Sequence, residues 1–421
     1  MLYERWLETV RQFGDRPALD DRINQRQWSF QELASEVAKQ PAASIRGIRF
    51  PQGRDVSFIL DVLTAWRDGA VVCPLEPGEA TPDLATNPPP GIVHLKQTSG
   101  TTAAKRFVLF TAEQLTADAH NIITTMGLSP DSPNLGVISL AHSYGFSNLI
   151  LPLVLSGVPL TLAESPLPEA LRAAAASGDH WTLPAVPALW QTWHQADAIP
   201  RNLRMAISAG APLPLPLEAE VLKNTGVKIH NFLGSSECGG IAFDKSHACR
   251  PNSGIAGTPM SNVQINIGDD GCIEVRGASV AAGYWPDADE SLKDGRFQTQ
   301  DLAEWHGDTL VLRGRAGDLI NVSGRKVSPD RVEASLRAHP AVSHCVVFGV
   351  PAAASAKNEE VIACVEWNSG SEEAELRAYA LETLNDWEVP STIVSVTLIE
   401  ANARGKISRR NWRERFLSGM I

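Results

Sequence analysis

The feature that most constrains the fold is an alternation of apolar runs with helical stretches, from about residue 92 to residue 240. Short apolar runs such as MAISAG (205–210) and KIHNFLG (228–234) alternate with stretches such as PEALRAAAASG (168–178) and LEAEVLKN (217–224). Strands joined through helices pair in parallel, because a parallel crossover needs a long connection. The pattern therefore predicts an α/β fold with helices layered on a parallel sheet.

The flanking regions differ from this pattern. Residues 255–315 contain short apolar segments separated by GDD and DDG turns, which predict a β-rich subdomain of hairpins. After Gly317 the apolar and helical segments outline a compact α+β domain of about 100 residues, a usual domain size. The other expected elements are helices at 28–37, 56–66, 329–339 and 372–385, a buried strand at 70–75, a proline-rich loop at 77–91, and strands at 343–350, 360–367 and 391–399.

Composition narrows the class of protein. The chain has 421 residues, 43% of them hydrophobic and 20% charged, which is typical of a globular enzyme of two or three domains. Its net charge of -11 argues against a nucleic-acid partner. The 6 cysteines show no CxxC spacing, and neither a signal-peptide core nor a run of 18 apolar residues is present. We therefore expect a cytoplasmic protein with reduced thiols and no membrane span.

A hydroxyl-rich loop lies between the apolar runs VHL and FVLF. Gly100 allows close backbone approach, the hydroxyl groups donate hydrogen bonds, and basic side chains balance phosphate charge, so the loop is suited to a polyphosphate. An ordinary Ser/Thr/Gly turn is the alternative. It is not a Walker loop, because Ala104 and Arg106 occupy the positions of the required glycine and hydroxyl. The residues of this loop are Thr98, Ser99, Gly100, Thr101, Thr102, Lys105 and Arg106.

Further segments follow this loop along the chain. They are LAHSYGFSNLILPL (140–153), SAGAPLP (208–214), FLGSSECGG (232–240), GRFQTQDLAEW (295–305), LRGRAGDLINVSGRKVSP (312–329) and ARGKISRR (403–410). In this order they resemble the adenylate-forming superfamily of acyl-CoA synthetases, peptide-synthetase adenylation domains and luciferases. The resemblance implies a large N-terminal domain (1–316) and a small mobile C-terminal domain (318–421), with a hinge at Gly317 and Asp318.

The resemblance also implies an ATP site. It assigns the β- and γ-phosphates to the hydroxyl-rich loop, although Ala103 and Lys105 replace the family's glycine and proline. Glu237 would coordinate Mg²⁺, and Ser236 would contact the α-phosphate. Asp301 and Arg315 would hold the ribose; a surface ion pair is the alternative for these two. The nucleotide pocket would also include Gly210, Ala211, Pro212, Leu233, Gly234 and Ser235, and Leu233 departs from the family's usual aromatic residue.

In the reaction that the family carries out, a carboxylate attacks the α-phosphorus of ATP, pyrophosphate leaves, and the acyl group passes from the adenylate to the thiol of CoA. Lys406 matches the catalytic lysine of the first step. Lysine suits that role because its flexible ammonium group can stabilise charge in the transition state. A solvated lysine in a basic tail is the alternative.

The substrate class follows from the acid pocket. No Asp or Glu lies between Ala141 and Leu153, which disfavours an α-amino acid. His142 matches the gate residue of acyl- and aryl-CoA synthetases, and a packed structural histidine is the alternative. An aromatic or medium-chain fatty acid suits the expected lining, which is Tyr144, Phe146, Ser208, Ala209, Gly239, Gly240 and Ile241.

Two other functions remain open. The first is transfer of the acyl group to the pantetheine arm of a carrier protein instead of free CoA. The second is a catalytically silent nucleotide- or acyl-binding module, suggested by Ala103, Ala104, Leu233 and Gln300. Retention of Glu237, Asp301, Arg315 and Lys406 favours an active acid–thiol ligase.

Overall fold

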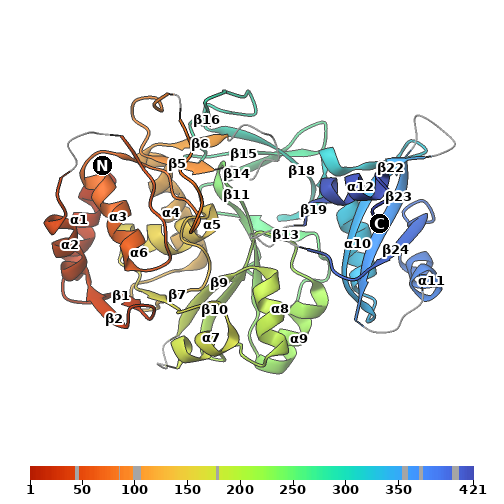
Figure 1. Ribbon diagram of the computed structural model, residues 1–421, viewed down its shortest axis with the longest axis horizontal. Coiled ribbons are helices and arrows are strands. Elements are labelled where there is room, and N and C mark those ends of the chain that lie inside the picture. The colour runs from red at the N-terminus through yellow and green to blue at the C-terminus, as the bar shows by residue number, and fades with distance from the viewer. Residues whose placement is uncertain are drawn as a thin grey trace.

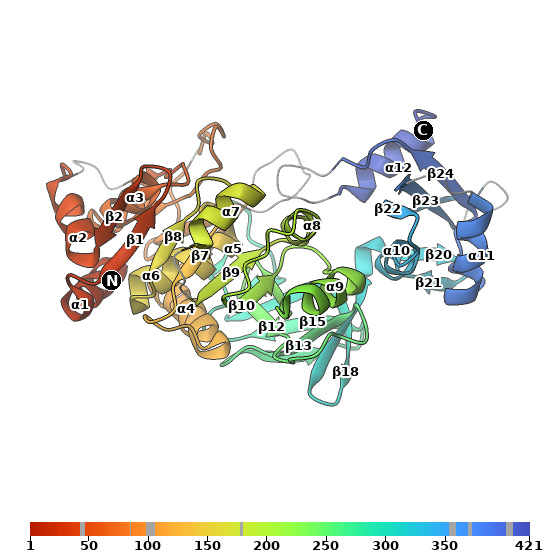
Figure 2. The same cartoon turned by 90° about the horizontal axis from the view of Figure 1, so that it is seen from below.

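A computed structural model describes residues 1–42, 47–84, 86–97, 106–176, 180–352, 359–368, 373–400 and 407–421. Most of the chain forms a large α/β body, and the C-terminal segment forms a separate group of elements beside it (Figure 1). Figure 2 shows the N-terminal helices at the opposite end of the body from this C-terminal group. The predicted α/β class is confirmed.

The main sheet contains 14 strands among the described residues. From β11 to β1 neighbouring strands pair in parallel, as the alternating pattern predicts. From β11 to β14 they pair antiparallel, so the β-rich region extends the same sheet. In spatial order the strands are β14 (Gln264–Ile267), β15 (Cys272–Arg276), β18 (Arg296–His306), β19 (Thr309–Arg315), β13 (Ile255–Pro259), β12 (Gly239–Phe243), β11 (Ile229–Ser235), β10 (Leu203–Ser208), β9 (Trp181–Ala185), β7 (Asn134–Gly136), β8 (Leu160–Leu162), β1 (Pro17–Asp21) and β2 (Arg26–Ser29), and β17 (Leu292–Lys293) pairs with β18.

A second sheet carries the strands that flank the hydroxyl-rich loop. Its order is β16 (Gly283–Trp285), β6 (Phe107–Phe110), β5 (His94–Gln97), β4 (Val71–Val72) and β3 (Ile48–Arg49). Strands β5 and β6 are antiparallel, and β16 pairs with the other edge of β6. The loop therefore connects two neighbouring strands of this sheet.

Local signals set the helix ends. Ser29 and Glu32 form a capping box at the start of α2, and Thr111 and Gln114 form another at the start of α4. Gly127 ends α4 in the left-handed conformation with φ 61°. The helical segments of the body are α1 (Leu2–Phe13), α2 (Phe30–Lys39), α3 (Val56–Arg67), α4 (Ala112–Met126), α5 (Ser143–Gly145), the π-helical turn η1 (Phe146–Ile150), α6 (Leu151–Ser156), α7 (Pro168–Ala175), α8 (Pro187–Gln195) and α9 (Leu215–Thr225).

The C-terminal segment has its own three-stranded sheet and its own hydrophobic clusters. The expected strand at 391–399 is shorter in the structure, and α12 was not expected from the sequence. In chain order the elements are the 3-10 turn η2 (Ala316–Asp318), β20 (Ile320–Val322), β21 (Arg325–Val327), α10 (Pro329–Arg337), β22 (Val342–Pro351), β23 (Glu359–Trp367), α11 (Glu373–Thr383), β24 (Thr392–Val396) and α12 (Arg409–Leu417). Among the described residues, no helix is both long and apolar enough to cross a membrane.

Candidate active site

Three of the segments singled out in the sequence follow the carboxyl ends of parallel strands. Strands β7, β10 and β11 end at Gly136, Ser208 and Ser235. The loops beyond them carry, respectively, the segments 140–145, 210–214 and 236–238. The carboxyl ends of parallel strands meet at one edge of a sheet, where α/β proteins bind ligands. Strand β11 pairs in parallel with β10 as far as Asn231 and then forms an antiparallel hairpin with β12, so residues 236–238 lie at the tip of that hairpin.

Two of these loops are in direct contact. The Oγ atoms of Ser143 and Ser236 lie 3.0 Å apart, although the two residues are 93 positions apart in the chain. His142 lies just before α5 and caps it, with its Nδ1 accepting a hydrogen bond from the backbone N–H of Tyr144 at 3.3 Å. His142, the predicted gate residue, is therefore the neighbour in sequence of Ser143, which contacts Ser236, the predicted ligand of the α-phosphate.

The carboxylate of Glu237 lies in the turn after β11 and is half-buried. Its Oε1 accepts a hydrogen bond from the hydroxyl of Tyr284 at 3.1 Å. Its backbone is held on both sides, because its N–H donates to Ser235 Oγ at 3.2 Å and its carbonyl accepts from the N–H of Ala281 at 2.9 Å. Mg²⁺ in nucleotide sites is commonly bound through one or two carboxylates plus phosphate oxygens. A single anchored carboxylate at this edge fits that donor set.

Arg106 lies at the end of the hydroxyl-rich loop, directly before β6. Its guanidinium lies 3.6 Å from the centre of the Tyr284 ring and pairs with Asp289 at 2.8 Å. The basic residue of the loop and the predicted metal ligand therefore both contact Tyr284. Thr98, Ser99, Gly100, Thr101, Thr102 and Lys105 lie outside the described residues.

The predicted ribose residues face each other across a strand pair. Asp301 on β18 is the register partner of Arg315 on β19. Arg315 Nε donates to Asp301 Oδ1 at 2.8 Å. The side chain of Arg315 is 59% exposed, so this pair contributes little to stability. The side chain of Asp301 is 19% exposed, and Arg315 is the last residue of β19, directly before the C-terminal segment.

The C-terminal motif is anchored by Arg409, at the start of α12. Its guanidinium pairs with Glu333 at 2.9 Å and Asp318 at 3.0 Å, and also with Asp330. Burial alone would lower the pKa of Arg409, but the carboxylates of Glu333 and Asp330 outweigh it and raise the pKa. Lys406, three positions earlier, lies outside the described residues. Arg409 therefore fixes the chain just beyond the predicted catalytic lysine.

Comparison with known proteins identifies the family. Residues 76–285 match the family model of AMP-binding enzymes, and residues 331–406 match the model of the AMP-binding enzyme C-terminal domain. A probable 2-succinylbenzoate–CoA ligase of Mycobacterium tuberculosis is 30% identical over 335 residues, covering 76% of this chain and 83% of the relative. The chain belongs to the AMP-binding enzyme family.

Other comparisons agree with this membership. A feruloyl-CoA synthase of an Amycolatopsis species is 27% identical over 344 residues, covering 76% of this chain and 69% of the relative. ATP-bound MatB of Rhodopseudomonas palustris has the same fold, with a TM-score of 0.86 at 18% identity over 99% of this chain and 98% of that chain. The predicted class of this AMP-binding enzyme, an acid–thiol ligase, is confirmed at the level of the family.

The residues expected to line the acid pocket are placed at different depths. Tyr144 lies over the ends of β9 and β10, with its hydroxyl 3.5 Å from the carbonyl oxygens of Ala185 and Ile207. Phe146 is fully buried against His94 and Trp66, so it packs in the main core. Ser208, Ala209, Gly239, Gly240 and Ile241 are also buried. His142 and Ser143 line a small hollow together with Lys96 and Glu76.

A buried polar cluster supports the start of strand β12, at Gly239 and Gly240, in this AMP-binding enzyme. Asp118 on α4 accepts from the backbone N–H of Gly240 at 3.2 Å and from Ser147 Oγ at 2.6 Å. Lys96 on β5 donates to Ser147 at 3.3 Å and lies 3.9 Å from the Asp118 carboxylate. Burial lowers the pKa of Lys96, and the charge of Asp118 opposes that shift. This cluster was not predicted from the sequence, because it joins strands and helices that are far apart in the chain.

This cluster leads to a prediction for Gly239. Its φ is +72°, and a Cβ built there would lie 1.9 Å from Asp118 Oδ1. Gly239→Ala should therefore lower the free energy of unfolding by about 2–3 kcal/mol, measured in urea, since backbone strain and displacement of a buried carboxylate add.

Gly226→Ala is the matched control for this change. Gly226 has φ +75°, but a Cβ added there would meet only open space. Its substitution should cost only the backbone strain, about 1 kcal/mol. Equal losses in the two variants would contradict the role given to Asp118.

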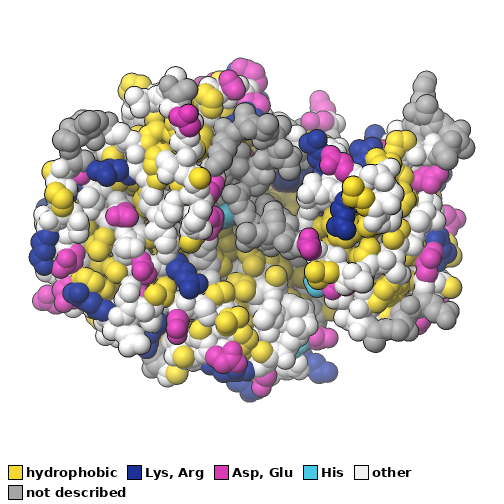
Figure 3. All heavy atoms as spheres, viewed as in Figure 1, with side chains coloured by type: hydrophobic (Ala, Val, Ile, Leu, Met, Phe, Trp, Pro, Cys, Tyr) yellow, Lys and Arg dark blue, Asp and Glu magenta, His cyan; other side chains and the backbone are white. Residues whose placement is uncertain are grey.

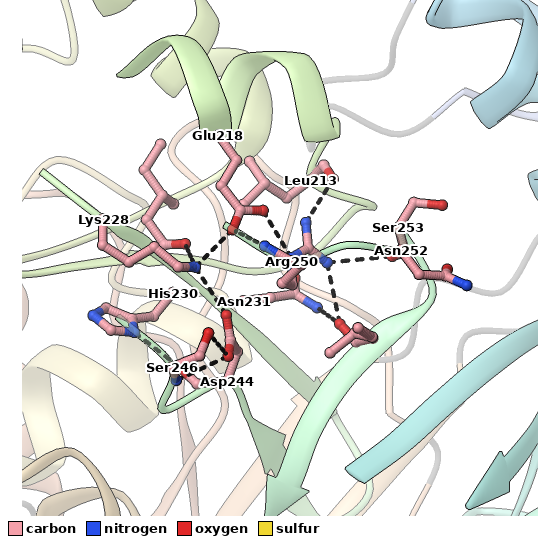
Figure 4. Close-up of polar contacts among 12 residues, drawn as sticks. Leu213, Glu218, Lys228, His230, Asn231, Asp244, Ser246, Arg250, Asn252 and Ser253 are labelled. Atoms are coloured by element: carbon pink, nitrogen blue, oxygen red, sulfur yellow. Dashed lines mark hydrogen bonds and ion pairs between the residues drawn. The ribbon is translucent and has the colours of Figure 1, made fainter. Parts of the chain in front are cut away.

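A second buried network holds the loop at residues 210–212, which is expected to form part of the nucleotide pocket (Figure 4). Arg250 donates through Nη2 to the carbonyl of Leu213 at 2.8 Å and through Nε to Glu218 at 2.8 Å. Lys228 pairs with Glu218 at 2.7 Å and with Asp244 at 2.8 Å. Two positive and two negative groups thus balance inside the protein. Leu213 directly follows Gly210, Ala211 and Pro212, so Arg250 fixes the end of that loop.

Proposed function

We propose that this enzyme activates a carboxylic acid with ATP, forms an acyl-adenylate and transfers the acyl group to the thiol of CoA. The observation that carries the proposal is the contact between the His142–Ser143 segment and the Ser236–Glu237 turn, where the Oγ atoms of Ser143 and Ser236 lie 3.0 Å apart. An aromatic or medium-chain fatty acid is the proposed substrate class. The apolar and very small residues of the expected pocket support it, and the names of two relatives, a feruloyl-CoA synthase and a succinylbenzoate–CoA ligase, fit an aromatic acid.

The residues would divide the work as follows. Asp301 would accept hydrogen bonds from the ribose hydroxyl groups, since a carboxylate offers two acceptors to a diol. Ser236 would donate to the α-phosphate, and Arg106 would face the outer phosphates. Glu237 would hold Mg²⁺, which neutralises charge on pyrophosphate when bound.

Two reactions would use this arrangement. In the first, an oxygen of the acid forms a bond to the α-phosphorus, and the bond from that phosphorus to the bridging oxygen of pyrophosphate breaks. In the second, the thiolate of CoA attacks the acyl carbonyl, and AMP leaves. No enzyme nucleophile takes part. Burial raises the pKa of the Cys238 thiol beside Glu237, which keeps that thiol unreactive.

We also propose that residues 1–316 and 318–421 are separate domains that turn about Gly317 and Asp318 between the two reactions. Separate hydrophobic clusters on the C-terminal side support this division. Figure 3 shows the surface hollowed between the two parts. Gly317 lies in η2, and its φ is not positive. Proline can therefore occupy this position without the backbone strain that it would cause at a left-handed site.

The hinge proposal predicts the effect of Gly317→Pro. Proline fixes φ near −65° and should hold one orientation. One half-reaction should then proceed at close to the wild-type rate while overall turnover stops, which separate assays of adenylate formation and thioester formation would measure. Normal turnover in the variant would place the hinge elsewhere.

The experiment that tests the function is acid-dependent exchange of pyrophosphate into ATP, over a panel of benzoic, cinnamic and C4–C12 fatty acids. Exchange with one acid class, followed by acyl-CoA formation when CoA is added, is the expected result. Exchange with no transfer to CoA, but with transfer to a pantetheinylated carrier protein, would favour the carrier-loading alternative. No exchange with any acid, together with retained nucleotide binding, would favour the silent module.

A further inference from the structure

Three segments that are distant in the chain meet at Tyr284 on β16. The turn after β11 supplies Glu237, whose Oε1 accepts from the Tyr284 hydroxyl at 3.1 Å. The end of the hydroxyl-rich loop supplies Arg106, whose guanidinium lies 3.6 Å from the centre of the tyrosine ring. The same half-buried side chain therefore contacts the proposed magnesium ligand with its polar end and the proposed phosphate-binding cation with its face.

The backbone around Tyr284 is well defined. Strand β16 pairs antiparallel with β6, and Tyr284 is the register partner of Val108, two residues after Arg106. A further link joins the same two regions, because the N–H of Ala281 donates to the carbonyl of Glu237 at 2.9 Å. Tyr284 is therefore held by the second sheet at a fixed distance from both functional side chains.

The chemistry of the hydroxyl contact has one direction. A carboxylate can only accept, so the phenol hydroxyl of Tyr284 is the donor and Oε1 of Glu237 the acceptor, at 3.1 Å. A carboxylate rotates easily about its last torsion, which has broad energy wells. A donor on Oε1 restricts this rotation and directs Oε2 toward another partner. Groups that orient a metal ligand in this way commonly control metal affinity.

The Arg106 contact is restrained on two sides. Asp289 pairs with the guanidinium at 2.8 Å and is itself held by the backbone N–H of Ser291 at 2.8 Å. Hydrogen bonds from Ser291, together with Arg106, lower the pKa of Asp289 to about 2, so it stays charged at neutral pH. The ring of Tyr284 and the carboxylate of Asp289 thus define where the cation lies.

We propose that Tyr284 is a positioning residue for the binding of magnesium and ATP: its hydroxyl orients the Glu237 carboxylate, and its ring supports Arg106. The inference rests on the proposed function, in which Glu237 holds Mg²⁺. Tyr284 lies within the region that matches the AMP-binding enzyme model, but outside the segments singled out in the sequence.

The test is calorimetric titration of the Tyr284→Phe variant with ATP at a series of Mg²⁺ concentrations, and with AMP in EDTA. Phenylalanine keeps the ring under Arg106 and removes only the hydroxyl. The Mg²⁺ concentration needed for half-maximal ATP binding should rise by about tenfold, while the affinity for AMP stays unchanged. Tyr3→Phe, which removes a partly buried phenol on α1, is the matched control and should change neither value.

A second variant tests the ring. Tyr284→Leu removes the hydroxyl and the cation–π contact, so it should lose a further factor of about five in ATP affinity without added loss of AMP affinity. Equal weakening of ATP and AMP in either variant would show that Tyr284 acts only on the fold and would overturn the inference. Unchanged Mg²⁺ dependence in Tyr284→Phe would also overturn it. Wild-type ATP binding that is independent of Mg²⁺ would instead refute the role of Glu237 in the proposed function.

Discussion

Replacing Lys406 with alanine is expected to slow acyl-adenylate formation by about 10²–10³-fold, the loss usual when one charge-stabilising group is removed from a transition state. Thioester formation from supplied acyl-adenylate should change little, because the lysine would act in only one orientation of the C-terminal domain. Single-turnover assays of the two half-reactions measure both effects. The prediction comes from the RGKISRR segment, and Arg409 in the structure anchors the chain three residues further on.

The control for this change is Lys223→Ala, at an exposed position in the last turn of α9. It removes the same charge from the protein surface and should leave both half-reactions unaltered. Equal loss of both half-reactions in Lys406→Ala would contradict a role limited to the first step. An unchanged rate of adenylate formation would show that Lys406 is an ordinary surface lysine.

Replacing Arg250 with methionine is expected to lower the free energy of unfolding by about 3–5 kcal/mol, the cost of breaking a buried ion pair by removing one partner. The side chains of Arg250 and Glu218 are 1% and 0% exposed. After the change, Glu218 keeps Lys228, but the network carries an excess negative charge, and the carbonyl of Leu213 loses its donor. Urea unfolding measures the loss, and ATP affinity should fall with it because the adjoining loop is released.

The matched control is Arg410→Met on α12. Arg410 pairs with Glu414 at 2.9 Å, but the two side chains are 66% and 62% exposed. An exposed pair of this kind contributes between about zero and 1 kcal/mol, so the control should remain near wild-type stability. A loss of less than about 1 kcal/mol in Arg250→Met would mean that the network does not stabilise the fold.

The sequence predicted the features that depend on local patterns. The alternation of apolar runs and helical stretches predicted the parallel strands, because the helix that connects two parallel strands appears in the sequence as a helical stretch between two apolar runs. The DDG turn predicted the β14–β15 hairpin, which the register from Gln264 to Ile267 confirms. The ordered motifs predicted the family, which the family-model matches confirm. The assignments to individual site residues rest on resemblance and stay predictions.

Other features are set only by the tertiary structure. Helix α12 has few apolar residues, and its position depends on Trp412 packing against β22 and β23 and on Arg409 reaching Glu333. The pairs Lys96–Asp118 and Arg250–Glu218 leave no local signal, because a lysine or arginine in sequence shows nothing about which distant carboxylate will neutralise it. The contact of Tyr284 with Glu237 also leaves no local signal in the sequence, since it joins residues 47 positions apart. Local periodicity determined which elements form, and the need to pair each buried charge and polar group determined how those elements meet around the site.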